Sequence, residues 1–186
     1  TVFIIGGIVD KKLGHSRLKR LFELAQISYA ETRTLRDNIK KISSNINVEY
    51  LSNFKPIPSF QLQKKTSSQK VINFVYLSRV NSDKGIFRSI ELLNEINSIN
   101  QNRQYKLDIF GVIDLSENDR IKFNKELKSN NNISYKGFLD LTKSNSYETL
   151  SSYHFFLFLT THVGEGFPGV LIDAMIAEVP IIASNW

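Results

Sequence analysis

The chain has 186 residues and a formal net charge of +6 at pH 7, with 41% hydrophobic and 23% charged residues. These proportions are ordinary for a globular protein, and no apolar run approaches the ~20 residues that a membrane-spanning helix needs. The sequence contains no cysteine, which excludes disulfides and thiolate metal sites. The positive balance favours anionic partners (nucleic acid, an acidic membrane surface or phosphorylated small molecules), but charge alone does not choose among them.

The first part of the chain alternates between short apolar runs and stretches with helical spacing. Val2–Ile5 is apolar, has no basic stretch before it and is followed by two glycines, so it predicts a buried strand rather than a signal peptide. A helix follows, with apolar residues on one face at Leu18, Leu21, Phe22 and Ala25. A second helix carries an apolar stripe of Leu35, Ile39 and Ile42, and Val48–Leu51 predicts another strand.

The alternation breaks between Ser52 and Ser68. Two prolines flank Ile57, and a polar, unpatterned run ends the stretch, which predicts an interdomain linker. We therefore predict that residues 1–55 are the C-terminal part of one domain, that residues 56–68 are a linker, and that residues 69–186 form a second domain.

The second domain shows the pattern of a parallel sheet with helices on both faces. Five apolar runs predict its strands: Val71–Leu77, Leu107–Phe110, Ile133–Tyr135, Phe155–Leu159 and Ile181–Ala183. Helices are predicted over about 84–97, after a capping box at Ser116 and Asp119, and over about 168–177. We expect Ile121 and Leu127 on the buried face of the middle helix. No helix follows the last strand, so we expect this α/β domain to be incomplete.

Ligands of open α/β sheets lie outside the carboxyl ends of the strands, and the loop Leu77–Gly85 is at such a position. Arg79 falls just past a strand and Lys84 falls at the start of the next helix. Two cations beside helix N–H groups form a receptor for phosphate, with arginine as a bidentate fork and lysine as a point charge. The alternative is a solvated loop with two ordinary basic residues.

The second loop of interest is Thr160–Met175, which follows the most apolar strand. Three glycines leave backbone amides exposed, Pro168 suits a first helical position, and Glu165 and Asp173 place carboxylates before and within the helix. Carboxylates with bare amides between them suit a ligand that carries both hydroxyls and phosphate. The alternative is a glycine-rich turn whose acidic residue favours the helix dipole.

The residues of these two loops resemble those of a known family. Glu165–Met175, followed by Val179–Ser184, resembles the E-x7-E segment of the retaining glycosyltransferases of family four. Ser78–Gly85 resembles the diphosphate-binding loop of that family, Ser134–Phe138 its glycine turn, and Asn47–Pro56 the crossing between its domains. The resemblance covers nearly the whole chain.

The resemblance implies a GT-B fold, in which two Rossmann-like domains face each other. Residues 1–55 would be the C-terminal part of the acceptor-side domain, and 69–186 a donor-binding domain truncated at its C-terminus. Arg79 and Lys84 would hold the donor diphosphate and neutralise the leaving group.

The remaining site residues are also implied by the resemblance. Glu165 would be the catalytic residue and would contact the donor sugar near the reacting carbon, and Asp173 would bind the ribose hydroxyls. The turn against the sugar and phosphates would be formed by Gly166, Phe167, Pro168 and Gly169.

Three positions depart from the pattern of that family. Asp173 stands where glutamate is usual and is one methylene shorter, so its reach to the ribose is in question. Glu178 stands where glycine is usual, which affects the end of the helix, and Ser78 replaces the customary glycine before the arginine.

The implied activity is transfer of a sugar, with retention at the anomeric carbon, from a nucleotide diphosphate-sugar to a glycan or lipid-linked acceptor, as in surface polysaccharide synthesis. No cofactor or metal is expected, and the sequence has no Asp-x-Asp of the kind that holds a divalent ion on a diphosphate. The alternatives are a nucleotide-sugar-binding GT-B module or epimerase without transferase activity, and a basic α/β nucleic-acid-binding domain, which the buried aromatic residues disfavour.

Histidines and a basic cluster complete the set of candidate residues. His154 abuts an apolar strand and is expected to be structural, His162 lies on the second loop, and His15 opens a helix, so the three do not form a metal site. We expect a cytoplasmic protein. The basic cluster of Lys11, Lys12, Arg17, Lys19 and Arg20 is either a solvated helix end or a contact with anionic lipid at the inner face of the plasma membrane.

Overall fold

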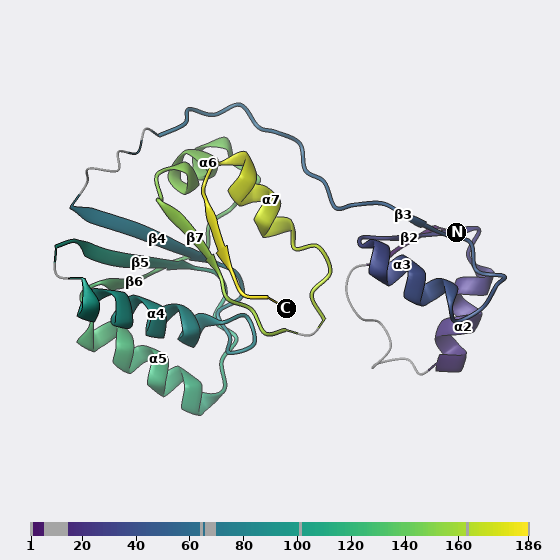
Figure 1. Cartoon of the computed structure of the whole chain (residues 1–186), viewed down its shortest axis with the longest axis horizontal. Coiled ribbons are helices and arrows are strands. Elements are labelled where there is room, and N and C mark those ends of the chain that lie inside the picture. Colours follow the sequence, from purple (N-terminus) through teal and green to yellow (C-terminus); the bar gives the residue numbers. More distant parts are fainter. Residues whose placement is uncertain are drawn as a thin grey trace. The chain divides into compact units, whose positions relative to one another are not determined.

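The computed structural model describes residues 2–5, 15–63, 65, 70–100, 102–162 and 164–185, with side chains from Ser16 onward. The chain divides into two compact units. The first contains residues 1–55 and 163–169, and the second contains residues 56–162 and 170–186. Figure 1 labels most of the elements of both units.

The first unit is built on a three-stranded parallel sheet of order β1-β2-β3. Its elements are β1 (Val2–Ile5), α2 (His15–Leu24), β2 (Ile27–Ala30), α3 (Arg33–Lys40) and β3 (Val48–Tyr50). The buried core joins both helices to the sheet through Leu18, Phe22, Ala30, Ile39, Ile46 and Val48. The strand β2 was not predicted from the sequence, because its buried positions are the small residues Ser28 and Ala30, which give no apolar run.

The second unit contains a five-stranded sheet of order β6-β5-β4-β7-β8, in which every neighbouring pair is parallel. Its elements are β4 (Val71–Leu77), α4 (Ile86–Ile99), β5 (Gln104–Phe110), α5 (Glu117–Ser129), β6 (Ile133–Gly137), α6 (Ser144–Ser151), β7 (Phe155–Phe158), α7 (Gly169–Ile176) and β8 (Ile181–Ala183). Helices α4 and α5 lie on one side of the sheet and α6 and α7 on the other (Figure 1). The predicted fold class is therefore confirmed.

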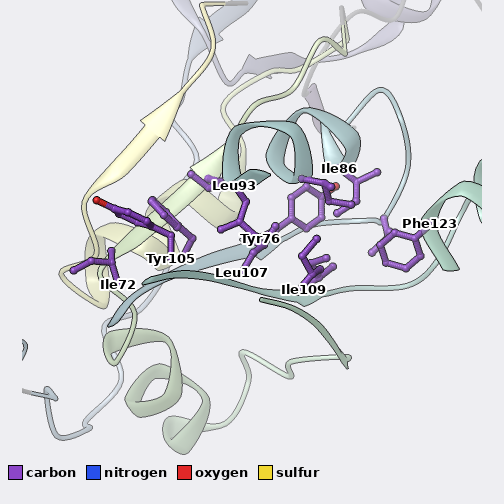
Figure 2. Close-up of a cluster of buried hydrophobic side chains, with 13 residues drawn as sticks. Ile72, Tyr76, Ile86, Leu93, Tyr105, Leu107, Ile109 and Phe123 are labelled. Carbon is purple, nitrogen blue, oxygen red and sulfur yellow. The ribbon is translucent and has the colours of Figure 1, made fainter. Parts of the chain in front are cut away.

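The central strand β4 supplies side chains to two separate cores, because successive residues of a strand point to opposite faces. Phe74 and Tyr76 pack beneath α4, in a cluster that includes Leu93 and the fully buried Phe123 of α5 (Figure 2). Val75 and Leu77 belong to the cluster under α6 and α7. Both faces of the sheet are covered, which explains why its strands read as continuous apolar runs.

The buried face predicted for α5 is partly wrong. Ile121 of α5 is 63% exposed, and Phe123 is buried in its place. Residues two apart on a helix point in nearly opposite directions, since a turn contains 3.6 residues. Phe123 and Leu127 are four apart and share the face that packs on the core.

The segment that follows Lys55 in the second unit packs along α6. The Gln63 N–H donates to the Ser151 hydroxyl at 3.1 Å, and the centroids of the Phe60 and Tyr147 rings are 5.5 Å apart. Part of the predicted linker, Lys64 and Thr66–Gln69, lies outside the described residues.

A residue with left-handed backbone geometry lies two positions after the end of helix α7. Glu178 has φ 53°, and the Val179 N–H donates to the Ala174 carbonyl at 2.9 Å, as in a helix-terminating turn. Side-chain-bearing residues are strained in this geometry, which agrees with the glycine that the resemblance led us to expect at the position.

We expect Glu178→Gly to stabilise the protein by about 0.5–1 kcal/mol, since relief of the strain outweighs the greater backbone freedom of glycine in the unfolded chain. The hydrogen bond that the Lys65 ammonium donates to the carbonyl of residue 178 is retained. The shift in the midpoint of urea unfolding measures the effect.

The matched control is Lys125→Gly in the exposed interior of α5, which should cost about 1 kcal/mol. A loss of stability in Glu178→Gly as well would contradict the assignment of strain to this residue.

Candidate functional site

The strand order of the second unit creates a topological switch point beside β4. The chain passes from β4 to β5 on one side, whereas β7 lies on the other side of β4. Ligands of open α/β sheets bind outside the carboxyl ends of the strands at such a point. The two segments at these ends follow Leu77 and Phe158.

These two segments are joined by hydrogen bonds at one carbonyl group. The Thr161 N–H donates to the Asp83 carbonyl oxygen at 2.8 Å, and the Thr160 hydroxyl donates to the same oxygen at 3.1 Å. The Gly85 backbone packs so closely on Leu159 that an added Cβ would lie 2.1 Å from the Leu159 carbonyl oxygen. The structure therefore brings the Arg79–Lys84 loop against the first residues of the segment that follows β7.

The Arg79–Lys84 loop is also paired with the loop that follows β5. The Val80 N–H donates to the Val112 carbonyl at 2.8 Å, and the Asp114 N–H donates to the Val80 carbonyl at 3.0 Å. The Val80 side chain is fully buried. These bonds extend the parallel pairing of β4 and β5 beyond the ends of both strands.

Arg79 points into solvent beside a carboxylate that the sequence analysis did not select. Its guanidinium Nη1 lies 3.5 Å from the Asp114 carboxylate, and both side chains are more than half exposed. The Asn81 amide donates to the same carboxylate at 3.4 Å. The rule that selected the other two loops also applies to Asp114, because it follows the carboxyl end of β5.

Lys84 stands directly before the N-terminus of α4. The Lys84 N–H donates to the Asn81 side-chain oxygen at 2.9 Å, and the half-buried Lys84 side chain is followed by Gly85 at the N-cap, with φ 81°. The positive end of the helix dipole and the ammonium group are thus contributed by neighbouring residues.

Asp173 lies within α7 and is 1% exposed. Its carboxylate accepts a hydrogen bond of 2.6 Å from the Tyr147 hydroxyl. Burial, together with this hydrogen bond and the negative charge of Asp173, raises the pKa of Tyr147 above its usual value. The phenol therefore stays protonated and acts as a donor.

The other predicted site residues belong to the first unit. Glu165, Gly166, Phe167, Pro168 and Gly169 are all half-buried. The Phe167 N–H donates to a Glu31 carboxylate oxygen at 3.4 Å, and the Asn53 amide donates to the Phe167 carbonyl at 3.1 Å.

The family of the chain follows from its sequence match. Residues 59–186 match the family described as glycosyl transferases group 1. The chain belongs to this family. No curated protein sequence matches the chain.

Solved structures of glycosyltransferases share the fold. A mutant of S. aureus TarM, in complex with fondaparinux, alpha-GlcNAc-glycerol and UDP, is 20% identical with a TM-score of 0.69 over 98% of this chain and 36% of that protein. Anabaena HepE in complex with UDP-glucose is 16% identical with a TM-score of 0.70, over 98% and 52%. The pneumococcal O-GlcNAc transferase GtfA, in complex with UDP and GlcNAc, is 15% identical with a TM-score of 0.66, over 99% and 37%.

These neighbours establish the GT-B class of fold for this group 1 glycosyltransferase chain. The chain spans 36% to 52% of the length of the three proteins. None of the helices in the described residues is long and apolar enough to cross a membrane.

The two histidines whose side chains the structure describes, His154 and His162, have different hydrogen-bond partners. The His154 side chain is 9% exposed, and its Nδ1 accepts a hydrogen bond of 3.1 Å from the Asn73 N–H. Burial, and then the nearby charge of Lys65, lowers the pKa of His154, so that the neutral ring is favoured. The His162 N–H donates to the Thr160 hydroxyl at 3.1 Å, and the His15 side chain lies outside the description.

Proposed function

We propose that this group 1 glycosyltransferase takes a sugar from a nucleotide diphosphate-sugar and transfers it, with retention at the anomeric carbon, to a glycan or lipid-linked acceptor in surface polysaccharide synthesis. The observation that carries the donor assignment is the junction of two loops at the switch point of the sheet, where Arg79 and Lys84 are placed. The resemblance of Glu165–Asp173 to the E-x7-E segment supports retention.

The chemistry of the donor suits these cations. A departing nucleoside diphosphate accumulates negative charge, and a guanidinium fork, an ammonium group and a helix N-terminus stabilise such charge. In this proposal Arg79 and Lys84 supply that stabilisation without a metal ion, and the protein itself carries no cofactor.

The remaining roles follow the resemblance. Glu165 contacts the sugar hydroxyls near the reacting carbon, the turn of Gly166, Phe167, Pro168 and Gly169 faces the sugar and phosphates, and Asp173 accepts hydrogen bonds from the ribose. Because Asp173 is 1% exposed, its role requires that the hydroxyls reach a carboxylate already bound by Tyr147. The two oxygens of a carboxylate can together accept about four hydrogen bonds, and the proposed role uses this capacity.

Structural neighbours support this class of substrate and setting. TarM and GtfA were solved with UDP, and HepE with UDP-glucose. WaaB is a lipopolysaccharide outer core galactosyltransferase, and WaaG is a glycosyltransferase involved in lipopolysaccharide biosynthesis. Sugar transfer by the whole protein, detected as a glycosylated product, distinguishes a transferase from a binding module or an epimerase.

We expect the full chain to bind one of UDP, GDP or ADP in a calorimetric titration. Arg79→Ala and Lys84→Ala should each weaken binding by about tenfold or more, because each removes a charge-assisted bond to phosphate. Lys125→Ala removes an exposed cation from α5 and is the matched control. Equal affinity in the wild type and both loop variants would exclude this phosphate site.

Asp114→Asn is the complementary variant. The exposed pair of Asp114 with Arg79 competes with a phosphate for the guanidinium, so its loss should tighten binding by up to about fivefold. Weaker binding would show instead that Asp114 orients Arg79 for the ligand.

The role of Asp173 is tested by comparing the best-bound nucleoside diphosphate with its 2′,3′-dideoxy analogue. The wild type should prefer the ribose form by about tenfold, and Asp173→Ala should lose this preference, because the hydroxyls lose their acceptor. The control is Asp108→Ala, which removes the other tyrosine-bound carboxylate of the unit, 2.7 Å from the Tyr153 hydroxyl. An unchanged preference in Asp173→Ala would make Asp173 a structural residue only.

We also propose that the protein works in the cytoplasm and contacts the anionic inner face of the plasma membrane. Arg17, Lys19 and Arg20 are exposed on α2, whereas Lys11 and Lys12 lie outside the described residues. Anionic lipid attracts such cations by about 1 kcal/mol each.

The full chain should therefore sediment with phosphatidylglycerol vesicles but not with phosphatidylcholine vesicles. The double variant Arg17→Glu, Arg20→Glu should bind at least about thirtyfold less, and Lys122→Glu, Lys125→Glu on α5 is the charge-matched control. Equal binding by both double variants would refute a specific contact through α2.

A further inference from the structure

The peptide group between Asp83 and Lys84 is held at both of its polar ends. Its carbonyl oxygen, on Asp83, accepts from the Thr160 hydroxyl at 3.1 Å and from the Thr161 N–H at 2.8 Å. Its N–H, on Lys84, donates to the Asn81 side chain at 2.9 Å. A peptide group is planar, so fixing both ends fixes the plane from which Lys84 departs.

The other side of Lys84 is restrained as well. Gly85 has φ 81° and packs against the Leu159 backbone, and its N–H donates to the Ser82 carbonyl at 3.0 Å. A side-chain-bearing residue would meet the Leu159 carbonyl there. The Lys84 Cα therefore lies between two restrained groups, both of which are secured by the segment that follows β7.

The Thr160 hydroxyl is the side-chain part of this restraint. Thr160 is 1% exposed, and the same hydroxyl that donates to the Asp83 carbonyl accepts a hydrogen bond of 3.1 Å from the His162 N–H. Hydrogen bonds are electrostatically stronger in a buried, weakly polarisable environment. The hydroxyl thus links the loop that carries Lys84 to the residues that lead into the glycine-rich turn.

Thr160 is itself anchored to the neighbouring strand. The Ser184 hydroxyl donates to the Thr160 carbonyl, and the Ser184 N–H donates to the Phe158 carbonyl at 3.1 Å. Ser184 directly follows β8. The hydrogen bonds therefore run from the end of β8, through Thr160, to the peptide group before Lys84.

We propose that Thr160 is a positioning residue for Lys84, whose buried hydroxyl sets the backbone from which the ammonium group reaches the diphosphate of the donor. This inference rests on the proposed phosphate role of Lys84. Thr160 does not touch the ligand in this assignment, and its effect is confined to the phosphate-dependent part of binding.

The test compares the affinity of the best-bound of UDP, GDP and ADP with that of the corresponding nucleoside. In the wild type the diphosphate should raise affinity strongly. Thr160→Val keeps the shape of the side chain but removes the hydroxyl, and it should reduce the ratio of the two affinities by about tenfold while leaving nucleoside binding unchanged. Thr160→Ser restores a hydroxyl and should restore the ratio.

Three further variants separate positioning from a general loss of structure. Thr161→Val removes an exposed hydroxyl 3.4 Å from the same carbonyl but keeps the N–H bond, so it should leave the ratio unchanged. Thr160→Val added to Lys84→Ala should have no additional effect, because the two act on one interaction. Asn81→Ala loosens the same peptide group from its other end and should reproduce the loss even if Thr160→Val fails to fold.

The outcomes distinguish the positioning role of Thr160 from the proposed phosphate role of Lys84. If the wild type binds the diphosphate no more tightly than the nucleoside, both the phosphate site and the role of Thr160 are refuted. If the wild type discriminates and Thr160→Val and Asn81→Ala discriminate equally well, only the role of Thr160 is overturned. An additive loss in the double variant with Lys84→Ala would also overturn it.

Discussion

The constraint on which the candidate site depends is the double anchoring of one peptide group, that between Asp83 and Lys84. Parallel strands bring their carboxyl ends to one edge of a sheet, but they do not fix the loops that leave those ends. Here the loop after β4 is fixed because its carbonyl is bound by Thr160 and Thr161 of the segment after β7. A lysine side chain is long and flexible, so a fixed starting point is the main means by which the backbone limits where the ammonium group can reach.

The two cations of the proposed phosphate site are prepared in different ways. Arg79 is exposed and lies beside Asp114, and an exposed ion pair of this kind contributes about 0–1 kcal/mol, so a phosphate group can replace the carboxylate at small cost. Lys84 is half-buried and depends on backbone restraint. The Arg79 side chain can thus change its partner, whereas the backbone from which Lys84 extends is fixed. This combination suits the proposed donor, which must be bound and whose diphosphate must then be released.

The strands of the second unit and the two loops of interest could be predicted from the sequence because both rest on strong local signals. Strands covered on both faces are apolar throughout. Ligands of such sheets bind outside the carboxyl ends of the strands, so the loops at those ends are the first candidates for a site. Helix α6 was missed because Tyr147 and Leu150 are its only large apolar residues, and its remaining buried positions are serines. The rule for strand ends covers the positions of Thr160 and Asp114, but it does not distinguish either residue from its neighbours in the loop, since a hydroxyl or carboxylate after a strand gains its meaning only from residues that are distant in the sequence.

The pairing of β4 with β7 also bears on how the molecule reaches its native state. The hydrogen bond between Asn73 and His154 joins residues 81 apart in the chain, and the bond from Thr160 to Asp83 joins residues 77 apart. Closing such long loops carries an entropic cost that the contacts repay only once they have formed, which slows assembly. During synthesis on the ribosome, the nascent α4 region therefore emerges well before β7, and the loop of the proposed phosphate site can be anchored only after β7 has paired with β4.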